Sequence, residues 1–206
     1  MEIQLENVAK KFNKEWIFRN ISLNLSQKET VAIIGPNGSG KSTLLQVIAG
    51  SLLQTSGKLL YIHDGHHIEP DCIYKFFSLV APALSLPEDF TLKEFIAFHF
   101  KFKRIKDGYD LNDLPVIFQL GKAKDKYIKN FSTGMKQRLK LGIAFYADSP
   151  ILLLDEPATN LDISGFDWYL EEIEKVIKEK MILVCSNRKD EYEFCNKYIN
   201  ILEYKN

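Results

Sequence analysis

One glycine-rich segment carries the residue types best suited to chemistry in this sequence. It reads Gly35-Pro36-Asn37-Gly38-Ser39-Gly40-Lys41-Ser42-Thr43 and fits the pattern G-x-x-x-x-G-K-[ST]. Glycines allow backbone conformations that are closed to other residues, so successive N–H groups can converge on phosphate oxygens. Lys41 is then expected to reach the β- and γ-phosphates, and the Ser42 hydroxyl to help hold Mg²⁺. We therefore predict that this segment binds a nucleoside triphosphate.

The elements on either side of this segment are the ones that such a loop requires. The apolar, β-branched run 30–34 precedes it and predicts a strand, and residues 42–49 are compatible with a helix. A helix that begins near Lys41 also directs the positive end of its dipole at a bound anion. This strand–loop–helix order makes the glycine pattern far more specific than the pattern alone.

A second segment ends in two carboxylates. The run 151–154 is continuously apolar and leads into Asp155, Glu156 and Pro157. Such a run predicts a central parallel strand, and ligands in parallel sheets gather at the carboxyl ends of the strands. Asp155 is expected to help hold Mg²⁺ through water, and Glu156 to orient and deprotonate an attacking water. The alternative, an ordinary acidic pair at a strand end, is disfavoured because the glycine-rich loop is present.

A third segment resembles a known family signature. Residues 131–138 read Phe131-Ser132-Thr133-Gly134-Met135-Lys136-Gln137-Arg138 and precede a helical pattern. They resemble the L-S-G-G-Q signature of ATP-binding cassette ATPases, with Ser132 and Gly134 retained and Phe131, Thr133 and Met135 as departures. Downstream, residues 159–162 (Thr-Asn-Leu-Asp) resemble the D-loop of that family. Upstream, residues 11–13 (Lys-Phe-Asn) resemble its adenine-stacking segment.

The resemblance covers essentially the whole chain and implies its fold and cofactors. It implies an α/β fold: a P-loop NTPase core with a mixed or parallel sheet, an N-terminal antiparallel β region and an inserted helical subdomain. Residues 1–206 would form a single nucleotide-binding domain, with the helical subdomain at about 83–148. The cofactors would be ATP and Mg²⁺, with Ser42 and Asp155 on the metal.

The resemblance also implies an active site that is split between two subunits. Two cassettes, identical or different, would pack head to tail with ATP between them. Ser132 and Gly134 of one would meet the γ-phosphate held by Lys41 of the other, and hydrolysis would open the pair. Phe12 would stack on adenine, with Trp16 as the alternative stacking residue. The other interpretation of Phe12 is that it simply packs in the core.

Two departures concern the rate of hydrolysis. Asn187 stands where the family has a histidine that contacts the γ-phosphate, and its amide can donate a hydrogen bond but cannot be protonated. The family's glutamine before the helical insertion falls near Ala81 and Pro82, which cannot bind a metal. Because Glu156 is present, we expect slow but real ATPase activity, with Glu156, Lys41 and Asn187 as the catalytic residues.

The composition fits a soluble globular protein and excludes several classes. Of 206 residues, 46% are hydrophobic and 26% are charged, and the net charge is zero, so no electrostatic argument favours nucleic acid as a partner. No apolar stretch is long enough to span a membrane, and the N-terminus lacks the features of a signal peptide. The three cysteines are scattered, which favours reduced, structural thiols in the cytoplasm.

Apolar patterning predicts the remaining elements. An opening antiparallel region is expected from strands at 3–8, 17–25, 30–34 and 58–62. Helices are expected at 92–102, 111–119, 135–147 and 164–179, and further strands at 151–155, 181–185 and 198–203. The His63–His67 segment contains an Asp-Gly pair and is read as a hairpin turn rather than a metal site.

Two other segments are rich in aromatic or basic residues, and neither is expected to be a ligand site. The aromatic stretch with Phe95, Phe98, Phe100 and Phe102 favours packing or a groove for a membrane partner. The basic stretch 101–106 favours a solvated face.

Three functions remain open at this point. The leading one is the ATPase subunit of a membrane transporter, most similar to export systems, which would act with a separate integral membrane subunit. It would then lie in the cytoplasm, peripheral on the inner face of the cell membrane. The alternatives are a soluble, non-transport cassette ATPase and a slow nucleotide-gated dimerisation module. In the leading case, the contacts to the transported substrate would lie in the membrane subunit.

Overall fold

The computed structural model describes residues 1–205 and divides into two units. The first unit is built from two β-sheets and one α-helix, with short 3₁₀ helices. The first unit contains residues 1–79, 149–156 and the chain from Ile177 onward, and the second contains residues 80–148 and 157–176. The predicted insertion at 83–148 lies inside the second unit. The chain passes between the units at the Leu79–Val80 and Glu156–Pro157 peptides, among others. That the whole chain is one nucleotide-binding domain stays a prediction.

The first sheet of this unit is antiparallel, with strand order β2-β1-β4-β5. Its strands are β1 (Glu2–Phe12), β2 (Glu15–Ser26), β4 (Ser56–His63) and β5 (His66–His67). Asp64 and Gly65 join the last two with φ angles of 50° and 78°, the left-handed pair that a tight hairpin turn needs. The prediction of a hairpin at His63–His67 is therefore confirmed.

The second sheet has the order β6-β7-β8-β3-β9. Its strands are β3 (Thr30–Ile34), β6 (Phe77–Val80), β7 (Ile151–Asp155), β8 (Met181–Cys185) and β9 (Lys197–Asn200). The prediction that 30–34 belongs to the antiparallel region is wrong, because β3 pairs in parallel with both β8 and β9. Four of the five residues of β3 and all five of β7 and β8 are buried, and strands covered on both faces are typical of parallel sheets.

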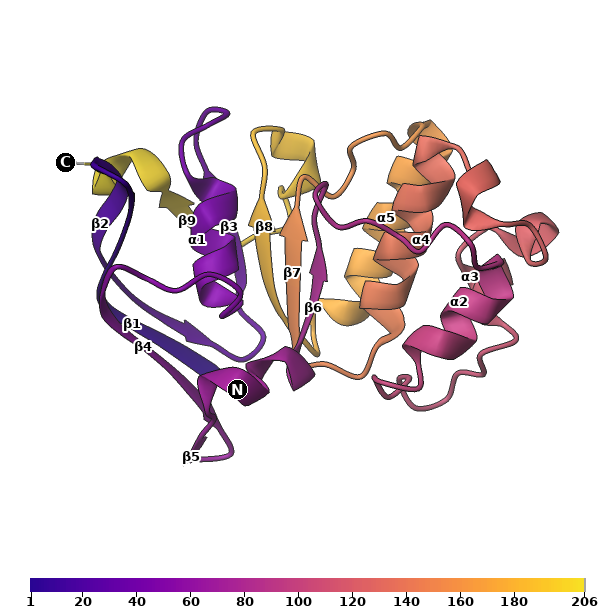
Figure 1. The fold of residues 1–206 in the computed structure, drawn as a ribbon, viewed down its shortest axis with the longest axis horizontal. Helices are drawn as coiled ribbons and strands as arrows, with labels where there is room; N and C mark the ends of the chain where they lie inside the picture. The colour runs from indigo at the N-terminus through magenta and orange to yellow at the C-terminus, as the bar shows by residue number, and fades with distance from the viewer. Residues whose placement is uncertain (206) are drawn as a thin grey trace. The chain divides into compact units, whose positions relative to one another are not determined.

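Helix α1 (Lys41–Ile48) joins the two sheets of this unit into one hydrophobic core (Figure 1). Leu44, Leu45, Val47 and Ile48 on its inner face are at most 1% exposed. They pack in a single cluster with residues of both sheets, among them Ile3, Phe18, Ile33 and Leu183. This packing fixes the glycine-rich loop, which connects β3 to α1.

The second unit is helical. Its helices are α2 (Leu92–His99), α3 (Leu114–Ile117), α4 (Thr133–Tyr146) and α5 (Ile163–Val176). Short 3₁₀ helices occur at Gly121–Ala123 and Ile128–Asn130 here, and at Pro70–Lys75, Lys189–Glu191 and Ile201–Tyr204 in the first unit. The four predicted helices are present: α2, α3 and α5 are shorter than predicted, whereas α4 begins two residues earlier and ends one residue earlier than predicted. The sequence prediction missed β6 and extended the last strand into a 3₁₀ helix.

Helices α4 and α5 pack through aromatic rings and one buried hydrogen bond. Phe145 contacts Trp168 and Tyr169, with ring centroids 6.0 and 6.3 Å apart. The Tyr146 hydroxyl donates to Glu172 Oε2 at 2.7 Å. No helix in the part of the chain that the structure describes has both the length and the apolar character needed to cross a bilayer.

Candidate nucleotide site

The glycine-rich loop surrounds a cavity in the first unit. The cavity has a volume of about 200 Å³ and is lined by Ile17, Asn37, Gly38, Ser39, Gly40, Lys41, Ser42, Thr43 and Glu156. Gly38 and Gly40 have φ angles of 73° and 104°, which favour glycine. A Cβ on Gly40 would also lie 2.4 Å from Ile17 Cγ2, so the backbone must pass close to β2 at this point. The loop is thus shaped as a concave backbone surface.

Lys41 is held inside its own loop. Lys41 is only 5% exposed. Its Nζ donates to the carbonyl oxygens of Gly35 and Pro36 at 2.9 and 3.1 Å. Both acceptors are neutral, so the positive charge is solvated by the loop but has no carboxylate partner in these bonds. An anionic phosphate group would therefore be a stronger acceptor than the carbonyls that hold it here.

Ser39 gives an independent reason to expect a ligand. The residue is 2% exposed, and its Oγ has no hydrogen-bond partner among the described residues. A buried hydroxyl without a partner costs free energy, and such groups are rare unless a ligand or water completes them. Because Ser39 lines the cavity, a phosphate oxygen there would satisfy it. The residues present therefore fit a nucleotide phosphate chain.

Ser42 and Asp155 meet at the edge of this loop. The Ser42 hydroxyl donates to Asp155 Oδ1 at 2.9 Å, which places two hard oxygen donors together. Magnesium is usually held by one or two protein oxygens together with substrate phosphates, so this pair fits Mg²⁺. Within residues 1–205 no group of three or more His, Cys, Asp or Glu side chains could hold a metal by itself. The predicted metal ligands thus fit a metal only in company with a nucleotide.

Burial dominates the electrostatics of Asp155. Desolvation raises the pKa of its carboxyl; the hydrogen bond from Ser42 lowers it, the charge of Glu156 raises it, and the charge of Lys41 lowers it. A carboxyl whose pKa is raised on folding holds its proton more tightly in the folded state. Ionisation of Asp155 therefore lowers the stability of the folded state. The full cost applies above the pKa that Asp155 has in the folded state, and it disappears below the pKa that Asp155 has in the unfolded state.

The Asp155→Asn variant is accordingly expected to be more stable than the wild type without nucleotide. The amide removes the buried charge and its oxygen can still accept from Ser42, so we expect a gain of about 1 kcal/mol at neutral pH, or 2–4 °C in Tm. The gap should close as the pH falls below the unfolded pKa of Asp155, which thermal unfolding at several pH values would show. Asp162→Asn is the control. Hydrogen bonds from Gly165 and Arg138 lower the pKa of Asp162, so this variant should be less stable than the wild type at neutral pH.

Glu156 adopts an unusual backbone conformation at the mouth of the cavity. Its φ angle is 47°, in the left-handed region, and its N–H donates to Cys185 O at 2.8 Å. Non-glycine residues in this region are uncommon and cluster at functional sites. The turn directs the chain away from β7 and places Glu156 among the residues that line the cavity.

The structure brings one further predicted residue to the loop and leaves another outside the cavity. Asn187 Nδ2 donates to Asn37 Oδ1 at 3.1 Å, so Asn187 lies beside the phosphate loop. Phe12 is 46% exposed, stands 4.9 Å from Lys10 Nζ, and is not among the residues that line this cavity. Ile17, which the sequence prediction missed, lines it instead; its position on β2 gave no signal because contact with Gly40 is a tertiary feature.

The signature residues lie in the second unit. Ser132 caps α4, and its Oγ accepts from the N–H of Met135 at 3.2 Å. A Cβ on Gly134 would lie 2.9 Å from the carbonyl oxygen of Asn160, so the signature and segment 159–162 pack closely. Arg138 strengthens this link, with Nη2 donating to Asp162 Oδ1 at 2.9 Å and to Ser164 Oγ at 3.1 Å. The structure thus brings together two motifs that are separate in the sequence.

Comparison with known proteins decides the family. A family model described as ABC transporter matches residues 18–159, more than half of the chain. The chain belongs to the ABC transporter family. It is an ATP-binding cassette ATPase, and the α/β fold predicted from its motifs is confirmed.

Relatives of this cassette include transport proteins from several bacteria. The chain is 28% identical to the lantibiotic transport ATP-binding protein SrtF of Streptococcus pyogenes, over 97% of this chain and 86% of that protein. It is 28% identical to the linearmycin resistance ATP-binding protein LnrL of Bacillus subtilis, over 98% of this chain and 66% of that protein. It is 31% identical to the maltose/maltodextrin import protein MalK of Escherichia coli, over 78% of this chain and 44% of that protein.

Solved structures share the cassette fold. A putative ABC transporter ATP-binding protein from Pyrococcus furiosus matches with a TM-score of 0.82 and 20% identity, over 100% of both chains. A dimeric structure of the cassette MJ0796 matches with a TM-score of 0.81 and 23% identity, over 97% of this chain and 94% of that chain.

A lysine of α4 contacts the segment where the family's glutamine is missing. A cavity of about 160 Å³ in the second unit is lined by Pro82, Thr133, Lys136, Gln137, Lys140, Thr159 and Asn160. Lys140 Nζ donates to Ala81 O at 3.4 Å, and burial lowers the pKa of this lysine. The segment that lacks a metal-binding side chain is therefore contacted by a cation from the signature helix.

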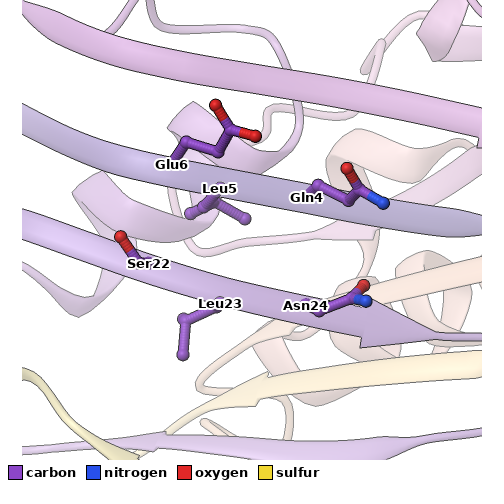
Figure 2. Close-up of a pocket in the computed structure, with 6 residues that line it drawn as sticks. All are labelled: Gln4, Leu5, Glu6, Ser22, Leu23 and Asn24. Atoms are coloured by element: carbon purple, nitrogen blue, oxygen red, sulfur yellow. The ribbon is translucent and has the colours of Figure 1, made fainter.

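The cassette has a larger hollow that does not fit a nucleotide (Figure 2). It measures about 410 Å³ and lies on β1 and β2, lined by Gln4, Leu5, Glu6, Ser22, Leu23 and Asn24. The lining contains a carboxylate and no cation, so a phosphate chain would be repelled rather than held. We assign the nucleotide to the smaller cavity at the glycine-rich loop.

Proposed function

We propose that this chain is the ATP-hydrolysing subunit of an ABC transporter and that nucleotide-driven dimerisation of cassettes powers a separate integral membrane subunit. The observation that carries the proposal is the division of the catalytic groups. Lys41, Ser42 and Glu156 line one cavity in the first unit, and Asp155 is bonded to Ser42 there. Ser132 and Gly134 belong to the second unit. In a head-to-tail pair, the second unit of one copy would supply its groups to the cavity in the first unit of the other.

The chemistry follows from the groups at the cavity. The loop N–H groups and Lys41 would hold the β- and γ-phosphates, and Ser39 Oγ would gain the partner it lacks. Glu156 would accept a proton from the attacking water, and Asn187 would donate a hydrogen bond beside the γ-phosphate. Magnesium, bound by Ser42 and Asp155, would neutralise charge on the phosphate oxygens. Ser132 and the Gly134 N–H of the opposite copy would complete the site.

The relatives support export and a position at the membrane. The two relatives that align with 97% and 98% of this chain are named for lantibiotic transport and linearmycin resistance. The maltose/maltodextrin import relative aligns with 78% of it. We therefore propose an export system, with this cassette in the cytoplasm and held on the inner face of the membrane by its partner. The dimeric MJ0796 structure supports the association of two cassettes.

Complementation between two inactive variants would test the split site. Lys41→Met removes the phosphate-loop cation, and Ser132→Arg blocks the signature, so each variant alone should hydrolyse little ATP. In a mixed dimer one site carries both defects and the other carries none. An equal mixture is therefore expected to recover on the order of a quarter of the wild-type rate of phosphate release. A mixture as inactive as its components would contradict the proposal.

A nucleotide-gated module with little hydrolysis remains the second candidate. Asn187 cannot be protonated, and neither Ala81 nor Pro82 can bind a metal, which both favour slow turnover. Wild-type chain that dimerises on ATP but releases no phosphate would establish this candidate in place of the first.

A further inference from the structure

The end of α2 and the residues that follow it have a composition that the proposed function does not use. Residues 98–106 read Phe-His-Phe-Lys-Phe-Lys-Arg-Ile-Lys, with four basic residues and no acidic one. We call them the aromatic–basic segment. Phe98 and His99 are the last residues of α2, and the rest of the segment follows the helix within the second unit (Figure 1).

Two phenylalanines of the aromatic–basic segment face solvent. Phe102 is 75% exposed and Phe98 is 42% exposed, and their rings meet edge to face with centroids 5.1 Å apart. Phe98 also lies 5.2 Å from Phe90, so the pair is anchored to neighbouring rings. Adjacent exposed aromatic rings are unusual on a free surface and mark sites of interaction.

The backbone holds these rings in place. The N–H groups of Phe102 and Lys103 donate to His99 O at 3.0 and 3.3 Å. Further along, Lys106 N–H donates to Tyr146 O and Asp148 N–H donates to Arg104 O, both at 2.9 Å. The aromatic–basic segment is therefore a fixed projection supported by α2 and the end of α4.

The charge of the segment is positive at neutral pH. Burial lowers the pKa of Lys103 to about 8, which still leaves it mainly protonated, and burial together with Lys103 lowers the pKa of His99 to about 4, so His99 is neutral. Arg104 is offset by Asp107 at 2.6 Å and Asp148 at 3.7 Å. Lys101 is exposed and sits between the two projecting phenylalanines in sequence.

We propose that the aromatic–basic segment docks directly on an anionic phospholipid surface, with Phe98 and Phe102 in the interfacial region and the exposed Lys101 against headgroup phosphates. A projecting aromatic ring on a protein needs a matching hollow, whereas a bilayer interface accepts it without shape complementarity. Lysine side chains carry a point charge on a flexible stem, which suits a diffuse anionic surface. This contact goes beyond the proposed function, since it needs neither ATP nor a membrane subunit.

Vesicle cosedimentation of the purified full chain tests the proposal. We expect binding to phosphatidylcholine vesicles that contain phosphatidylglycerol, and much weaker binding to phosphatidylcholine alone or at high salt. Phe102→Ala should weaken binding about tenfold, because the lost ring area no longer leaves water. Lys101→Gln should weaken it about fivefold. Both side chains are exposed, so folding should be unaffected, and an unchanged thermal unfolding curve would verify this.

A matched control removes one apolar group and one charge elsewhere. Leu53 is 76% exposed and Lys178 is exposed, so Leu53→Ala with Lys178→Gln should bind vesicles like the wild type. No wild-type binding to anionic vesicles would overturn the proposal, as would binding that Phe102→Ala leaves unchanged. Equal retention on polyglutamate with no effect of Phe102→Ala would assign the segment to acidic protein instead. None of these outcomes bears on ATP hydrolysis, which the complementation experiment tests separately.

Discussion

Replacing Glu156 by glutamine is expected to reduce phosphate release about 1,000-fold while ATP binding is retained, because the amide cannot accept the proton of the attacking water. The exchange is nearly isosteric, so the left-handed turn at φ 47° and the bond from the Glu156 N–H to Cys185 O should persist. ATP that cannot be hydrolysed would keep two copies together. Light scattering during size-exclusion chromatography with Mg·ATP should therefore show a dimer of the variant where the wild type returns to monomers.

The control for this variant is Glu171→Gln on α5, an exposed carboxylate far along the sequence from the phosphate loop. It should leave both the rate and the elution volume unchanged. Phosphate release that is equal in wild type and Glu156→Gln would refute the assignment of Glu156 as general base. In that case the carboxylate at the end of β7 would be a structural feature of the turn.

Lys41→Met is expected to weaken ATP binding about 100-fold, because charge-assisted hydrogen bonds to phosphate are lost and nothing else in the loop carries a positive charge. The methionine fills most of the same buried volume but leaves the carbonyl oxygens of Gly35 and Pro36 without the Lys41 donor. We therefore expect a modest loss of stability while the fold survives. The rise in Tm that saturating ATP gives the wild type should shrink or vanish in the variant. A thermal shift titration with ATP measures both effects at once.

Lys10→Met is the matched control for the loss of a lysine bound to carbonyl oxygen. Lys10 Nζ donates to Leu53 O at 2.7 Å, much as Lys41 Nζ donates to its loop, but Lys10 lies on the exposed end of β1. The Lys10 variant should keep the full ATP-dependent rise in Tm. An equal loss in both variants would mean that the effect of Lys41 is general destabilisation rather than lost phosphate contact.

Local patterns sufficed to predict most elements of the first unit. The predicted bounds of β7 and β8 match the observed ones, because a continuous apolar run between polar segments marks both ends of a strand. The same type of run at β3 was assigned to the wrong sheet, since its neighbours in space, β8 and β9, come from the far end of the chain. β6 was missed because four residues with only two of them buried give little periodic signal.

The candidate site was predictable where its residues follow one another in sequence. The loop at 35–43 and the pair Asp155 and Glu156 are contiguous motifs, so their residue types alone suggested their chemistry. Ile17 over Gly40 and Lys140 beside Ala81 are contacts between distant segments, which carry no local pattern. Asn187 lies between these two cases, because the family resemblance predicted its position but only the structure shows its hydrogen bond to Asn37.

Cys185 ends β8 next to the phosphate loop, and its fully buried Sγ contacts Lys41 O at 3.4 Å. Burial raises the pKa of this thiol well above its usual range, so it is inert towards alkylating reagents while the protein is closed. Cys195 is 5% exposed and Cys72 is half-buried, which gives three native thiols of graded accessibility. The alkylation rate of the buried Cys185, measured relative to that of the more accessible Cys72, therefore reports how often the nucleotide-binding region opens.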